Sequence, residues 1–179
     1  MKAAYTGTAK FLHWLSALLI LGLLPLGFYM SDLKLSPEKL QLYSWHKWAG
    51  VTVFVLVLLR LLWRIGHRAP ALPAHMKGLE RLAAHLGHFA LYALMLAIPL
   101  SGWLMSSAKG VQTVWFGVLP LPDLLAKDKE LGQLLGEVHE TLNFVLIAVL
   151  VAHIGAALKH HFFDRDDVLT RMLPQRRMN

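Results

Sequence analysis

Four long apolar stretches constrain this chain more than any other feature. They cover approximately residues 10–30, 45–65, 85–107 and 139–159. The hydrocarbon core of a bilayer is about 30 Å thick, so a helix needs about 20 apolar residues to cross it. A chain in lipid must also satisfy its own backbone hydrogen bonds, which favours an α-helix for each stretch. We therefore predict an all-α, integral membrane four-helix bundle, with a single domain over residues 1–179.

Composition excludes several classes of function. The chain is 56% hydrophobic and 16% charged, with a net charge of +7 and no cysteine. Without cysteine there are no disulfides, no iron–sulfur clusters, no thiol catalysis and no covalent attachment of c-type haem. The basic residues flank the apolar stretches and do not form a continuous surface stripe, which argues against a nucleic-acid partner. We expect membrane lipid to be the main surroundings of the protein.

The distribution of lysine and arginine predicts how the chain crosses the membrane. More of them lie in the N-terminal segment, second loop and C-terminal tail than in the other two loops, and cytoplasmic loops are enriched in these residues. They are Lys2, Lys10, Arg60, Arg64, Arg68, Lys77, Arg81, Lys159, Arg165, Arg171, Arg176 and Arg177. Both termini are therefore predicted to be cytoplasmic. The third loop contains VWFGVLPLPDLL (114–125), which we interpret as an outer interfacial flap with Trp115 and Phe116 at headgroup depth.

Two histidines stand fourteen residues apart on the fourth apolar stretch, at His139 and His153. Over fourteen residues an α-helix turns through about 1400°, which leaves the two rings about 40° apart, and rises by about 21 Å. The rings therefore share one helix face at two heights. Burying an imidazole without a partner is costly, and an ionisable group in a membrane helix is a functional candidate. Each ring is expected to meet a partner from another helix.

At the outer level the matching residue is His46, which begins the second stretch as His139 begins the fourth. Gly50 lies one turn further on the same face. A small residue there would let a flat macrocycle approach the backbone.

At the inner level two partners for His153 are possible. We favour His13, on the first stretch, and His88, on the third, is the alternative. A ligand from the first helix would leave the HLGH sequence (85–88) free for another task.

The ligand types select the bound group. Structural zinc sites use four ligands and commonly include sulfur, and copper sites usually recruit methionine or cysteine. Two opposed imidazoles in a dry bundle are typical of axial ligands to haem iron. We predict two b-type haems, with His46 and His139 as ligands to the outer iron and His13 and His153 to the inner iron. Histidines that merely bond between helices or reach the interface are the structural alternative.

These residues resemble a known family. The stretches FLHWLSALLI (11–20), HKWAGV (46–51), RLLWR (60–64), LAAHLGHFALYALMLAIPLSGW (82–103), HETL (139–142) and LKHHFFDRDDVLTRMLP (158–174) are similar to those of bacterial cytochromes b561. The wider group includes the di-haem cytochrome b subunits of hydrogenases and formate dehydrogenases. The resemblance implies the same ligand pairing, a bacterial inner membrane location and ubiquinone as electron acceptor.

The resemblance also implies a function for the outer side. Stand-alone members of the family resemble superoxide:ubiquinone oxidoreductases, and we favour that activity here. Lys47 and Lys109 are candidates for steering the superoxide anion towards the outer haem. Acidic residues slightly outnumber basic ones on that side, so steering would have to be local. The alternative is a membrane anchor that passes electrons from a periplasmic dehydrogenase or hydrogenase to quinone, and a non-catalytic electron carrier would fit either case.

The inner side should hold the quinone. Its reduction consumes protons, and four histidines are available there: His85, His88, His160 and His161. We expect His160 to lie at the quinone, because it follows His153 by two helical turns on nearly the same face. Arg60 and Arg64 are expected to bind haem propionates or quinone through charge-assisted hydrogen bonds. His67 and His75 are interpreted as solvated residues of the second loop.

Overall fold

The computed structural model describes residues 4–174 and contains four long helices. They are α1 (Gly7–Asp32), α2 (Pro37–Gly66), α3 (Gly78–Ala108) and α4 (Lys129–Phe162). All four are long and apolar enough to cross a membrane. The prediction of an all-α membrane bundle is confirmed. Lys2, Arg176 and Arg177 of the charge count lie outside the described residues.

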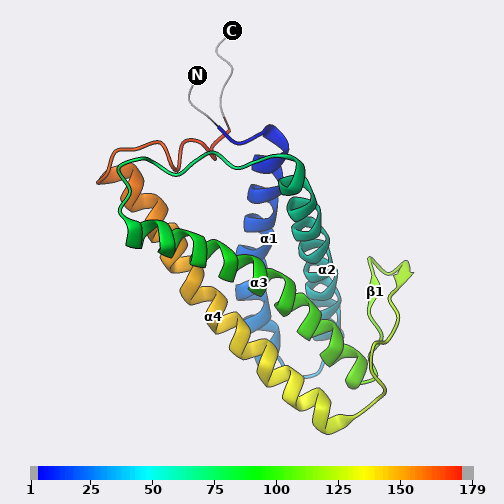
Figure 1. Cartoon of the computed structure of the whole chain (residues 1–179). Helices are drawn as coiled ribbons and strands as arrows, with labels where there is room; N and C mark the ends of the chain where they lie inside the picture. Colours follow the sequence, from blue (N-terminus) through cyan, green and yellow to red (C-terminus); the bar gives the residue numbers. More distant parts are fainter. Residues whose placement is uncertain (1–3, 175–179) are drawn as a thin grey trace.

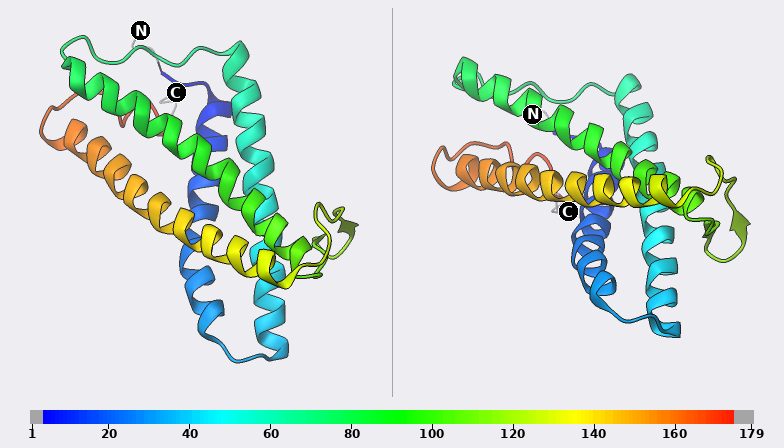
Figure 2. Two further views of the ribbon diagram at one scale, coloured as in Figure 1. Left: turned by 60° about the horizontal axis from the view of Figure 1, so that its bottom comes forward. Right: turned by 90° about the horizontal axis from the view of Figure 1, so that it is seen from below.

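The helices form two antiparallel pairs that cross each other (Figures 1 and 2). Among the described residues the extensive helix contacts are between α1 and α2, between α3 and α4, and between α2 and α3. The start of α1, the end of α4 and the α2–α3 connection lie at one end of the bundle, called the terminal end here (Figure 1). The α1–α2 loop and a small hairpin lie at the other, the hairpin end. Which end faces the cytoplasm stays a prediction from charge.

Helices α2, α3 and α4 begin well before the apolar stretches expected from the sequence. Ser36 caps α2 by accepting the Lys39 N–H, with Pro37 at the first helical position, and Asp128 caps α4 by accepting the Leu131 N–H. Such caps satisfy backbone donors that the helix itself leaves free. The early turns are polar, so hydropathy alone does not reveal them. His46 and His139 consequently lie inside continuous helices and do not begin them.

A compact core occupies the middle of the bundle and most other apolar side chains point outward. The core consists of Ile20, Val53, Val57, Leu91, Leu94, Met95, Ile98 and Leu146. Along every helix these positions fall between the two predicted histidine levels. Large side chains such as Leu18 and Phe89 are 70% and 73% exposed. Exposure of this extent on membrane-crossing helices is expected of lipid-facing surface.

The loop after α3, interpreted from the sequence as an interfacial flap, contains a small hairpin. Strands β1 (Val114–Trp115) and β2 (Leu119–Pro120) pair antiparallel. Residues 116–118 connect the strands, and Phe116 and Gly117 both have positive φ within a tight turn that the Val118 N–H closes by donating to the Trp115 carbonyl. Trp115 turns inward, where its Nε1–H donates to the Trp48 carbonyl and Thr52 hydroxyl of α2. Of the two residues expected at headgroup depth, Trp115 is half-buried and Phe116 is exposed.

Candidate functional site

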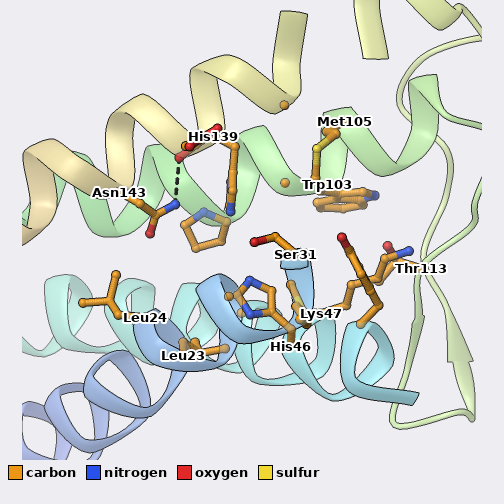
Figure 3. A pocket seen from close by; sticks show the side chains of 18 of the residues that line it. Leu23, Leu24, Ser31, His46, Lys47, Trp103, Met105, Thr113, His139 and Asn143 are labelled. Atoms are coloured by element: carbon orange, nitrogen blue, oxygen red, sulfur yellow. Dashed lines mark hydrogen bonds between the residues drawn. The ribbon is translucent and has the colours of Figure 1, made fainter. Parts of the chain in front are cut away.

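At the hairpin end, His46 of α2 and His139 of α4 point towards each other across a cavity (Figure 3). Their ring centroids are 6.4 Å apart and the ring planes differ by 73°. The two helices make no extensive contact with each other. The rings therefore face each other across space that the helices leave open.

The 6.4 Å between the ring centroids is close to the distance expected when both imidazoles bind one metal ion. A metal–imidazole bond is about 2.0 Å, and a five-membered ring with bonds of about 1.35 Å has a radius of about 1.15 Å. Two rings on opposite sides of one ion would thus have centroids about 6.3 Å apart. Direct ring contact or a hydrogen bond between the imidazoles would not require this distance. The pair fits the axial ligand set of a haem iron.

Each ring of this pair lies against a glycine on a neighbouring helix. A Cβ at Gly27 of α1 would lie 3.4 Å from His46 Cε1, and one at Gly102 of α3 would lie 3.2 Å from His139 Cε1. Gly50 lines the cavity and a Cβ there would meet nothing within 4 Å. Helix periodicity pointed to Gly50 but could not point to Gly27 or Gly102, because it reveals no contact between different helices.

Hydrogen bonds orient His139. Its Nδ1 lies 3.0 Å from the Ile98 carbonyl oxygen and 3.0 Å from the Ser101 hydroxyl, which itself donates to Ile98. A proton on Nδ1, donated to the Ile98 carbonyl, leaves the Nε2 lone pair free for a metal, the usual arrangement of a ligating histidine. Nδ1 of His46 is buried and has no hydrogen-bond partner among the described residues.

The cavity between these rings has a volume of about 350 Å³ and receives side chains from all four helices. Lys47 and Lys109 line it together with the two histidines (Figure 3 labels Lys47). The Lys47 ammonium donates to the Val111 carbonyl at 3.3 Å. The stem of Lys109 runs over Gly132 of α4, where a Cβ would lie only 2.9 Å from the Lys109 Cγ. Both predicted steering residues therefore border the same cavity.

At the terminal end three imidazoles come together. His13 of α1 and His153 of α4 have centroids 6.4 Å apart, the same as the first pair. His88 of α3 is nearer to His153, at 5.6 Å. That distance is shorter than two imidazoles on one metal require, whereas the His13 distance matches it. The spacing favours His13 over His88 as the partner of His153.

The predicted basic residues lie beside this second group. The guanidinium groups of Arg60 and Arg64 lie 5.4 and 5.9 Å from the centroid of the Tyr92 ring. Arg60 also interacts electrostatically with His13 and His153. A cation at this position suits an anionic group bound nearby.

His160 is buried and already paired. Its Nδ1 lies 2.7 Å from Asp166 Oδ2 and 3.1 Å from Asp164 Oδ2. His75, expected to be solvated, has a side chain 59% exposed but also contacts Asp166. Sequence reasoning missed both carboxylates, since nothing in the run DRDD distinguishes a buried aspartate from an exposed one. His85 is exposed and His161 is half-buried.

A model of the prokaryotic cytochrome b561 family matches residues 4–175 of this chain. The chain belongs to that family. Cytochrome b561 homolog 2 of Escherichia coli (strain K12) is 36% identical over 168 residues, which cover 90% of this chain and 86% of the relative. Cytochrome b561 homolog 1 of the same organism is 29% identical over 178 residues, with 97% and 98% covered. A probable superoxide oxidase CybB of Yersinia pestis is 27% identical over 171 residues, 93% of both chains.

Family membership confirms the coarse prediction from sequence. This cytochrome b561 is a multi-pass protein of the bacterial inner membrane that transfers electrons within it, and the family implies b-type haem binding.

Proposed function

We propose that this cytochrome b561 oxidises superoxide at the hairpin end and reduces ubiquinone at the terminal end, with two b-type haems between them. One observation carries the proposal: two imidazole pairs, both with centroids 6.4 Å apart, lie at two heights along one face of α4. Pairs of this spacing at two levels fit a chain of two cofactors across the bilayer. By the charge distribution the hairpin end is periplasmic.

The residues that would hold the haems are His46 and His139 at the hairpin end, and His13 and His153 at the terminal end. Bound haem b supplies a one-electron couple between ferric and ferrous iron. Gly27 and Gly102 hold the hairpin-end rings in place by close contact, and Gly50 leaves the cavity wall open. Arg60 and Arg64 would neutralise propionate groups at the terminal end.

Superoxide is the proposed donor because cations border the hairpin-end cavity and a relative is named a probable superoxide oxidase. Lys47 and Lys109 would raise the local concentration of a small anion at the cavity. The reaction balances without another reactant: two superoxide anions become two dioxygen molecules, and one quinone takes up two electrons and two protons to become quinol. The protons must enter at the terminal end, where His85, His88, His160 and His161 lie.

Charge reversal at the cavity tests the proposed donor. Lys47→Glu should slow haem reduction by generated superoxide by up to about tenfold at low ionic strength and less at high, because steering is screened by salt. The rate is measured from the haem absorbance at several salt concentrations. Lys34→Glu, the same charge reversal at an exposed residue of the α1–α2 loop that does not line the cavity, is the matched control. Equal rates for the wild type and Lys47→Glu at every salt concentration would remove the evidence for steering.

One observation favours the anchor alternative. Phe116, Val118 and Leu119 of the hairpin are 55%, 83% and 52% exposed, so a periplasmic redox protein could dock there. In that case superoxide would not reduce the purified protein, whereas the partner dehydrogenase would.

A further inference from the structure

The end of α4 carries a cluster of titratable groups that the proposed electron path does not use. The chain turns back after Phe162 through Arg165, which has a positive φ of 51°. This turn brings Asp166 against His160, and the Asp166 N–H donates to the His160 carbonyl. A residue other than glycine rarely adopts this conformation, so the surrounding contacts hold the carboxylate in place.

Asp166 lies between two imidazoles. Its Oδ2 is 2.7 Å from Nδ1 of His160 and 3.4 Å from Nε2 of His75, which belongs to the α2–α3 loop. The first is a short hydrogen bond, and the second needs to close by only a few tenths of an ångström to become one. The His75 side chain is 59% exposed, whereas those of Asp166 and His160 are buried, at 8% and 9%. The three groups thus connect solvent to a buried ring.

The charged residues near Asp166 form ion pairs with one another. Asp164 also contacts His160, but the Lys159 ammonium neutralises it at 2.8 Å and reaches Glu80 of α3 at 3.0 Å. Among the described residues the ion pairs of Asp166 are with His75 and His160 only. Burial favours a higher pKa for Asp166, but hydrogen bonds from the Val168 N–H and His160 outweigh it and the pKa is lowered. Both of its partners are imidazoles, whose two ring nitrogens can accept and donate protons.

We propose that His75, Asp166 and His160 form a relay that carries protons from the aqueous phase at the terminal end to ubiquinone bound beside His160. The relay rests on the proposed function, because it requires quinone reduction at this end. The step starts with Asp166 protonated and with His160 in the tautomer that carries its proton on Nε2. The Nε2 proton passes to an oxygen of the reduced quinone while Nδ1 takes the carboxyl proton, which leaves Nδ1–H hydrogen-bonded to the Asp166 carboxylate. His75 then returns a proton to the carboxylate and recovers one from water. His160 touches the substrate, whereas Asp166 and His75 act through it.

The test starts from chemically reduced protein, so it does not depend on the electron donor. Purified holoprotein with both haems reduced is mixed rapidly with a short-chain ubiquinone, and haem oxidation is followed by absorbance in H₂O and D₂O. Asp166→Asn should slow oxidation about tenfold or more, as loss of proton transfer does, and enlarge the solvent isotope effect. Asp167→Asn, which removes the neighbouring carboxylate of the Arg171 ion pair, should stay within about twofold of the wild type.

A second variant distinguishes a loss of proton transfer from a structural defect. His75→Ala changes an exposed loop residue, so its folding should be preserved. It should slow oxidation and recover when free imidazole is added, because a small base can replace the missing ring, whereas a purely structural defect would not recover. Wild-type rates in both Asp166→Asn and His75→Ala, or slow oxidation that imidazole leaves unchanged in His75→Ala, would overturn the relay alone. Wild-type haems that quinone fails to oxidise would overturn the proposed function and the relay with it.

Discussion

At both ends of the bundle two imidazole rings stand 6.4 Å apart, but their surroundings differ. The rings of His46 and His139 lie in a cavity, each against a glycine, and His139 is oriented by the Ile98 carbonyl. The rings of His13 and His153 share their space with a third imidazole and an arginine. Equal spacing therefore does not imply an equal site.

The difference matches the tasks proposed for the two ends. A cavity lined by lysines and closely backed rings suits the approach of a small anion to a rigid site. A cluster of several imidazoles beside charged groups suits chemistry in which protons accompany electrons. On this interpretation the hairpin-end site should depend on packing and the terminal-end site on titratable groups.

Removing a ligand from each pair has the largest expected effect. His139→Ala should lose one haem and keep the terminal-end haem reducible by quinol, and His13→Ala should lose the other, because each pair would ligate its own iron independently. A pyridine haemochrome assay of purified protein gives the stoichiometry, and the visible spectrum identifies the haem that remains. Variants that kept two haems would refute the ligand assignment, and variants that lost both would show that the two ends are not independent.

Sequence reasoning paired those four histidines, as the structure does, because helix geometry is regular. The fourteen residues between His139 and His153 place both rings on one face at two heights whatever the rest of the chain does. The apolar lengths likewise predict four crossing helices. The observed ring pairing needed only one histidine at each matching depth on another helix.

What the sequence did not reveal depends on contacts between segments that are distant in the chain. Gly27 and Gly102 look like ordinary small residues of membrane helices until the structure places a ring against each. The polar first turns of α2 and α4 carry no hydropathy signal, so the apolar stretches do not reveal where these helices begin. Asp166 lies in a charged run, and only the turn at Arg165 buries it.

Filling the space behind His139 tests whether packing governs the hairpin end. Gly102→Ala places a methyl group 3.2 Å from the ring, which should cost about 1–3 kcal/mol as overpacking does. The hairpin-end haem should then be released at lower temperature, while the terminal-end haem is unaffected. Gly87→Ala, on the same helix with nothing within 4 Å of the new Cβ, serves as control. Equal loss of the two haems in Gly102→Ala would contradict the local effect.

The smallest expected effect concerns the third imidazole at the terminal end. His88→Phe keeps a ring beside His153 but removes a titratable nitrogen, so both haems should remain bound because His13 and His153 still pair. The reduction potential of the terminal-end haem should shift by no more than about 60 mV, equivalent to a tenfold change in a one-electron equilibrium. Its dependence on pH should weaken, since one fewer imidazole can take up a proton as the iron is reduced.

Redox titration at several pH values, with the hairpin-end haem as an internal reference, measures both changes. Loss of a haem would indicate that His88, and not His13, is the ligand. An unchanged pH dependence would mean that His88 does not couple proton uptake to reduction of the terminal-end haem.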